Sequence, residues 1–152
     1  MRKSWVIGLL FLLTFACSKS IDRAEEKEEL LRINQEQRSA HLTNDAKLLV
    51  QSIADSLISV DSGNITINSN EAIENRFASY FKTVKYYEWD DLRQPLIEVA
   101  SSGDLASMSV LKRTIIEGLD GKKDTTIFAW TSLFRKVNDH WKMYSITSTK
   151  TR

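Results

Sequence analysis

The sequence LASMSVLKRTIIEGLDGKKDTTIFAWTSLFRKVNDHWKMYSITST, residues 105–149, decides the fold of this chain. It contains three long runs rich in β-branched and aromatic residues, at 105–116, 125–137 and 141–149. The short segments between these runs hold Gly, Asn and Asp, which suit the backbone of tight turns. The pattern predicts three antiparallel strands connected as a meander.

Two shorter strands are expected before the meander. Residues 83–89 are β-branched and aromatic, and residues 96–100 form an apolar run that follows Pro95. Between these two runs, Asp90 and Asp91 are expected to form a solvated strand end.

The part of the chain before these strands carries mainly helical patterns. Residues 24–42 place apolar side chains among charges without Pro or Gly, which indicates an amphipathic helix. Clusters of capping residues at 43–45 and 68–70 precede two further helices. Between them, residues 57–60 and 65–67 flank an Asp-Ser-Gly-Asn turn and predict a hairpin. Helices followed by strands predict an α+β domain, with the helices packed on one face of a curved antiparallel sheet.

The N-terminal segment has the pattern of a secretory signal. Arg2 and Lys3 precede an apolar run at 5–16 that is too short to span a bilayer as a helix. Ala16 is the small residue expected just before a cleavage site. We therefore expect residues 1–16 to be a signal peptide.

Cys17 follows this segment directly and is the only cysteine of the chain. It resembles the lipid-modified cysteine of bacterial lipoproteins, which implies a membrane anchor through lipid such as palmitate. Residues 17–27 would then be a lipidated polar tether, and residues 28–152 the folded domain. Ser18, rather than Asp, resembles signals that send lipoproteins to the outer membrane, facing the periplasm or the cell surface. The alternative is an ordinary thiol in a leader that is uncleaved or cleaved elsewhere.

The charge of the chain excludes one class of function. Without Arg2 and Lys3, 19 basic residues face 20 acidic ones, and the two signs are interspersed. A nucleic-acid-binding protein needs a basic stripe, so we expect no nucleic-acid partner.

Several short sequences, in this order, resemble the nuclear transport factor 2-like superfamily and within it the SnoaL-like and bacterial lipoprotein branches. They are AHLTNDA (40–46), IAD (53–55), DSG (61–63), AWTSLFRK (129–136), NDHWK (138–142) and SITST (145–149). The resemblance implies a cone, in which a strongly curved sheet wraps around N-terminal helices and encloses a cavity. It also implies a possible homodimer through the exposed sheet face. Some members are ketosteroid isomerases, polyketide cyclases or dehydratases, and many others only bind partners or small molecules, so the fold does not decide the function.

The residues that isomerase-type members use are missing at the matching positions. The catalytic base would fall near Asp61, but Ser62-Gly63-Asn64 follows it and indicates an exposed turn. The family's tyrosine donor would fall near Gln37, and its acidic donor near Ser132 or Leu133. None of these side chains can serve as the acid.

The best remaining catalytic candidates are His41, Asp45 and Asp55. If the helix continued through Asn44, His41 and Asp45 would share one of its faces, and His41 would act as a general base oriented by an aspartate. The alternative makes Asp45 a helix N-cap and His41 a half-buried packing residue. We expect no metal, because the chain has only two histidines, and no cofactor.

Four aromatic side chains are candidates for binding a ligand: Trp89, Phe128, Trp130 and Trp141. Strand alternation sends Phe128, Trp130 and Ser132 to one face of their strand. If that face is the inner one, the cone could hold a small apolar or planar molecule. The alternative is that these rings fill the core.

The function expected from the sequence is therefore binding rather than catalysis. A lipoprotein of the cell envelope would bind a small apolar molecule or a protein partner. The alternative is a SnoaL-like lyase, isomerase or hydrolase with His41 as its base.

Overall fold

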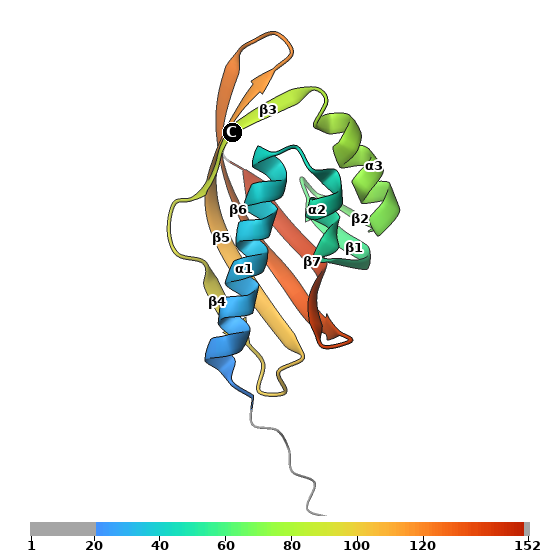
Figure 1. The fold of residues 1–152 in the computed structure, drawn as a ribbon, viewed down its shortest axis with the longest axis vertical. Coiled ribbons are helices and arrows are strands. Elements are labelled where there is room, and N and C mark those ends of the chain that lie inside the picture. The colour runs from blue at the N-terminus through green and yellow to red at the C-terminus, as the bar shows by residue number, and fades with distance from the viewer. Residues whose placement is uncertain (1–20, 151–152) are drawn as a thin grey trace, which may run out of the picture.

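One sheet of seven strands carries the fold, and three helices lie against its concave side (Figure 1). The computed structural model describes residues 21–150, so Cys17, the expected signal peptide and the first part of the expected tether lie outside the described residues. The helices are α1 (Arg23–Leu42), α2 (Ala46–Gln51) and α3 (Asn70–Tyr80). The strands are β1 (Ile53–Asp61), β2 (Asn64–Ser69), β3 (Val84–Asp91), β4 (Leu96–Val99), β5 (Leu105–Gly118), β6 (Lys123–Val137) and β7 (His140–Lys150).

The long helix α1 begins and ends where its sequence predicts. The Asp22 carboxylate caps it by accepting hydrogen bonds from the backbone N–H groups of Ala24 and Glu25. The helix buries Leu30 and Ile33 against the sheet and runs along the concavity (Figure 1). The prediction that N-terminal helices lie inside a curved sheet is confirmed.

The two short helices also start on the predicted capping residues. The Asp45 carboxylate accepts a hydrogen bond of 2.9 Å from the backbone N–H of Leu48 at the start of α2. At the start of α3, the Ser69 hydroxyl accepts one of 3.2 Å from the backbone N–H of Ala72. Between α1 and α2, Asn44 takes a left-handed conformation with φ of 55°, which ends the first helix and turns the chain.

Strands β5, β6 and β7 form the predicted antiparallel meander, with Met108 opposite Ser132 and Ser132 opposite Ile146. The order of the sheet is β2-β1-β7-β6-β5-β3, and β4 also pairs with β5. One pairing differs from an all-antiparallel sheet, because β1 runs parallel to β7. The sheet is therefore mixed, and it curls without closing.

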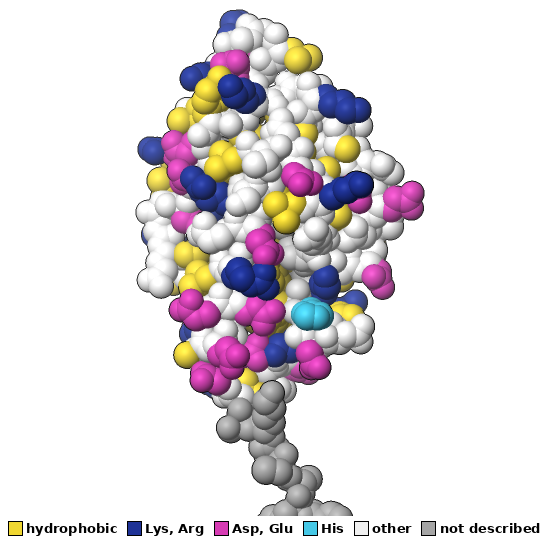
Figure 2. Space-filling view, in the orientation of Figure 1, with side chains coloured by type: hydrophobic (Ala, Val, Ile, Leu, Met, Phe, Trp, Pro, Cys, Tyr) yellow, Lys and Arg dark blue, Asp and Glu magenta, His cyan; other side chains and the backbone are white. Residues whose placement is uncertain are grey.

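The core lies between the helices and the inner sheet face, and its largest fully buried apolar side chains are Leu30, Ile73, Phe134 and Trp141. On the surface, side chains of both charges are interspersed over the face shown in Figure 2, and acidic ones gather at the end where α1 begins. Within residues 21–150, no helix combines the length and the apolarity that a membrane crossing requires.

Candidate functional site

A cavity of about 610 Å³ lies between the helices and the inner face of the sheet. This volume falls in the range of small-molecule pockets. Six aromatic side chains from α3, β3 and β6 line it: Phe77, Tyr80, Tyr86, Trp89, Phe128 and Trp130. Eight aliphatic and methionine side chains add to this apolar surface, and exposed polar side chains line the rim: Asp61, Ser62, Asn64, Thr66 and Arg76. The buried part of the cavity therefore suits a largely apolar molecule.

His41 enters this cavity from the last turn of α1 and is 8% exposed. Its ring stacks on the indole of Trp89, with centroids 4.4 Å apart and planes inclined by 15°. The edges and faces of Phe77, Phe81 and Tyr86 surround it at centroid distances of 5.2 to 6.1 Å. His41 is therefore held in an aromatic cage.

The protonation state of His41 follows from these surroundings. Burial lowers the pKa of His41 to about 4, although its hydrogen bond to Gln37 opposes this shift, and the charge of Lys112 lowers the pKa further. The ring is therefore neutral at pH 7. Its Nδ1 lies 2.7 Å from the carbonyl oxygen of Gln37, which can only accept, so Nδ1 carries the proton. Nε2 is left as a hydrogen-bond acceptor.

A buried ion pair lies beside the Trp89 indole. Lys112 is 0% exposed, and its Nζ lies 2.7 Å from Oδ1 of Asp91 and 3.9 Å from the centroid of the Trp89 ring. The angles between these two groups do not fit a hydrogen bond, so the contact is an ion pair only. Asn34 donates a hydrogen bond of 2.7 Å to the other oxygen of Asp91.

The expectation that Asp90 and Asp91 form a solvated strand end is therefore wrong for Asp91. The Asp91 side chain is only 17% exposed, because α1 covers this end of β3 and places Asn34 against the carboxylate. Asp90 is more exposed and pairs with Arg38 of α1 at 2.6 Å.

Ser132 is the one fully buried hydroxyl of the cavity wall in the described part of the chain. It is 0% exposed on the inner face of β6, and its Oγ has no hydrogen-bond partner among residues 21–150. A buried hydroxyl without a partner is rare, because it loses its bonds to water without replacement.

The structure does not bring His41, Asp45 and Asp55 together. Helix α1 ends at Leu42, so Asp45 does not share a helical face with His41 and instead caps α2. Asp55 lines a second, polar hollow of about 510 Å³ together with Lys47, Glu74 and other side chains. His41 alone of the three lines the aromatic cavity.

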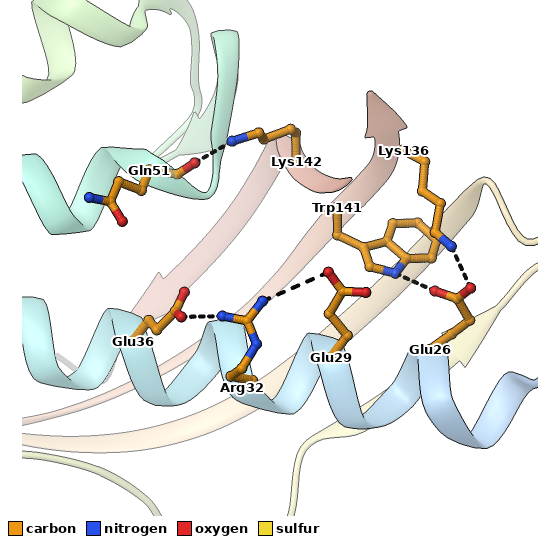
Figure 3. A network of polar contacts seen from close by, with 8 residues as sticks. All are labelled: Glu26, Glu29, Arg32, Glu36, Gln51, Lys136, Trp141 and Lys142. Carbon is orange, nitrogen blue, oxygen red and sulfur yellow. Dashed lines mark hydrogen bonds and ion pairs between the residues drawn. The ribbon is translucent and has the colours of Figure 1, made fainter. Parts of the chain in front are cut away.

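The four aromatic residues that were predicted to bind a ligand also fall into two groups in the structure. Trp89, Phe128 and Trp130 line the cavity, and the rings of Trp89 and Trp130 lie 5.5 Å apart. Trp141 is not among the lining residues and packs under the first turns of α1, where its indole N–H donates a hydrogen bond of 2.7 Å to Glu26 (Figure 3). Trp141 is therefore a core residue that anchors the helix.

Neither the buried Lys112 nor the isolation of the Ser132 hydroxyl was predicted from the sequence. Strand alternation places Lys112 on the same inner face of β5 as Val110 and Thr114, which was a signal for a buried charge. Asp61 lies at the exposed end of β1, on the rim of the cavity, as the turn chemistry predicts. Among the described residues, no three His, Cys, Asp or Glu side chains are grouped so that they could hold a metal ion.

Comparison with known proteins gives matches at the level of structure only. No protein-family model matches the sequence, and no curated protein matches it significantly. Many solved structures are similar, and three that are similar over most of both chains illustrate the match. An NTF2-like protein from Cytophaga hutchinsonii has a TM-score of 0.68 at 15% identity and covers 86% of this chain and 100% of its own.

The second is a ketosteroid isomerase-like protein from Erwinia carotovora atroseptica, with a TM-score of 0.64 at 16% identity over 84% of this chain and 98% of its own. The third, described as a candidate dehydratase of the NTF2-like family from Streptomyces avermitilis, has a TM-score of 0.68 at 14% identity. It covers 85% of this chain and 99% of its own. At these identities the similarity concerns the fold, and the chain has the α+β cone fold of the nuclear transport factor 2-like proteins.

Proposed function

We propose that this protein is a lipid-anchored protein of the cell envelope that binds a small, largely apolar molecule in its cavity without transforming it. The observation that carries the proposal is the aromatic cavity of about 610 Å³ with a neutral His41 in its wall. Apolar walls with few polar groups are typical of pockets that hold small molecules.

The same geometry argues against the catalytic alternative. A general base works best when its pKa is near the working pH, whereas burial holds the pKa of His41 at about 4. Neither Asp45 nor Asp55 reaches the cavity to orient the imidazole, and Asp61 is exposed on the rim. A lyase, isomerase or hydrolase with His41 as base would have to work without an adjacent carboxylate.

Binding of 2-methylnaphthalene, a planar apolar probe, tests the proposal. The protein for this titration is the chain from residue 17 with Cys17→Ser, which carries no lipid and contains every contact of the described fold. We expect saturable binding with one site per chain, followed by the fluorescence of the probe and of the tryptophans. Absence of saturable binding would contradict the proposal.

A pair of variants locates the probe. Ser148 lines the cavity on β7, and its neighbour Thr149 is exposed on the other face of the strand. Ser148→Trp should fill the cavity and abolish binding, whereas Thr149→Trp adds the same bulk outside and should leave it unchanged. Equal effects of the two variants would place the probe elsewhere. Recovery of a chemically altered molecule after incubation with a host extract, lost in His41→Gln, would favour the enzyme.

The outer face of the sheet supports the further proposal of a homodimer. Two rows of side chains that cross from β1 to β5 there carry no charge: Ile58, Ser145, Leu133 and Ser107 in one, and Val60, Thr147, Thr131 and Ser109 in the other. A broad uncharged face is typical of a surface that another protein covers. Light scattering should give a dimer that Thr131→Arg converts to a monomer, while Ser101→Arg in an exposed turn does not.

A further inference from the structure

The starting observation is the isolated hydroxyl of Ser132. This side chain is 0% exposed, lines the cavity, and finds no hydrogen-bond partner among residues 21–150. Its neighbours across the strands are Met108 and Ile146, which offer no side-chain hydrogen-bond donor. An apolar residue at this position would fill the same space without leaving a buried polar group unpaired, so the hydroxyl destabilises the free protein.

The other buried polar side chains of the wall are already engaged. Asn34 donates to Asp91, Gln37 donates to the Leu49 carbonyl and to Ser52, and Thr114 donates to the Thr126 carbonyl. Apart from Ser132, the unused polar atoms of the buried lining residues in the described part of the chain are acceptors: the neutral Nε2 of His41 and the side-chain oxygens of Asn34 and Gln37. The deep wall therefore offers a ligand one hydroxyl, which can also donate, and otherwise only acceptors.

The charges of the lining residues restrict the chemistry of the ligand further. Among the described residues, the cation that lines the cavity is Arg76, which is exposed at the rim, so no buried side chain of the wall would pair with a carboxylate or phosphate. A cationic ligand would find no carboxylate in the buried part of the wall, because Asp61, the acidic lining residue, is exposed on the rim. A hydroxyl group is uncharged, and it can accept from Ser132 and donate to Ser132 or to His41.

We infer that the cavity selects an apolar ring compound that carries a hydroxyl group, and that Ser132 is the residue that recognises this hydroxyl. The inference rests on the proposed binding function and specifies its ligand class. Trp89, Trp130 and Phe128 supply the apolar surface for the rings. Trp130 lies two residues before Ser132 on the same strand face, so a ring against Trp130 brings its substituent to Ser132.

The test compares 2-naphthol with 2-methylnaphthalene, in which a methyl group of similar size replaces the hydroxyl. Both are titrated into the Cys17→Ser chain from residue 17, with and without Ser132→Ala. Ser132→Ala should weaken binding of 2-naphthol roughly three- to tenfold, the effect of one lost hydrogen bond, and leave 2-methylnaphthalene within about twofold. Ser101→Ala, the same change in an exposed turn, should alter neither affinity.

The stability of the free protein provides a second readout. Ser132→Ala should be at least as resistant to urea as the parent chain, because it removes an unpaired hydroxyl. Ser132→Cys retains the side-chain size with a weaker donor and should weaken 2-naphthol binding in the same direction. A structural role for the hydroxyl would instead lower the stability of Ser132→Ala and affect both probes alike.

The outcomes separate the inference from the proposed function. If both probes bind and Ser132→Ala changes their affinities equally, or changes neither, the hydroxyl-selective role of Ser132 is overturned while cavity binding stands. If neither probe binds the parent chain, the proposed function fails and the inference fails with it.

Discussion

The imidazole of His41 lies almost parallel to the indole of Trp89, with ring centroids 4.4 Å apart. The Nζ of Lys112 contacts the same indole at 3.9 Å. These three side chains come from α1, β3 and β5, so their contacts join the central helix to two strands of the sheet. Two of them, His41 and Trp89, form part of the cavity wall.

The free energy of unfolding should fall as the pH is lowered from neutral to mildly acidic, because of the protonation of His41. Its pKa is about 4 in the folded chain, against 6.5 in the unfolded chain, so the unfolded state binds the proton first as the pH falls. The stabilisation is complete above pH 6.5 and is lost progressively down to about pH 4. The full difference corresponds to about 3 kcal/mol.

Urea unfolding at a series of pH values from 7.5 to 5 measures this slope. His41→Gln removes the titrating ring, so its stability should be lower at pH 7.5 but should depend less on pH over this range. A slope that is unchanged in His41→Gln would show that other groups cause the loss.

Substitutions of Lys112 and Asp91 should have strongly non-additive effects on the free energy of unfolding. Lys112→Met keeps most of the buried side-chain volume but leaves the partly buried Asp91 carboxylate with Asn34 alone, and should cost about 3 kcal/mol of unfolding free energy. Adding Asp91→Asn removes the unpaired charge. The double variant should therefore be more stable than the sum of the single effects by at least about 1 kcal/mol. Additive losses in urea unfolding would contradict a coupled pair.

The sequence predicts the local parts of this fold well. Asp45 and Ser69 cap their helices, and the turns of the meander fall where the Gly, Asn and Asp residues stand, because these choices depend on a few neighbouring residues. The parallel pairing of β1 with β7 was not predicted. It joins Ile58 to Ser145, which are far apart in the sequence, and no local pattern specifies such a partner.

The sequence predicts only part of the candidate site, because the rest depends on contacts between residues that lie far apart in the sequence. Strand alternation brings Phe128 and Trp130 to the inner face, and both line the cavity. The grouping of His41 with Asp45 required a helix that continued past Leu42, and the left-handed turn at Asn44 prevents it. The pairing of Lys112 with Asp91 depends on how β3 lies beside β5, where Asp91 is opposite Lys112, and on the cover provided by α1.

Glu26 should be the acidic residue that fastens the start of α1. It pairs with Lys136 and accepts the indole N–H of Trp141, and its side chain is 16% exposed (Figure 3). Glu26→Ala should cost about 1–2 kcal/mol, because it removes a charge-assisted hydrogen bond and leaves the indole N–H unpaired. Glu29→Ala is the matched control, since Glu29 lies on the same helix and its exposed pair with Arg32 contributes at most about 0.5 kcal/mol. Equal losses in urea unfolding would show that the contact with Trp141 is not the cause.

Cys17 should determine whether the protein is held at the membrane. No helix within residues 21–150 can cross a bilayer, and the end of the domain where α1 begins carries Glu25 and Glu26. An acidic end gains nothing from anionic headgroups, so attachment would depend on acyl chains, each buried CH₂ of which contributes about 0.8 kcal/mol.

The mass of the protein from its own host should correspond to a chain that begins at Cys17 and carries diacylglyceryl and acyl groups. Cys17→Ser should lose this added mass and the firm membrane attachment after carbonate extraction, whereas Ser18→Ala should retain both. A retained leader would reveal itself in the same mass spectrum, so membrane association through residues 1–16 is distinguished from a lipid anchor. A Cys17→Ser protein without its leader that stays as firmly bound as the parent would contradict the lipid anchor.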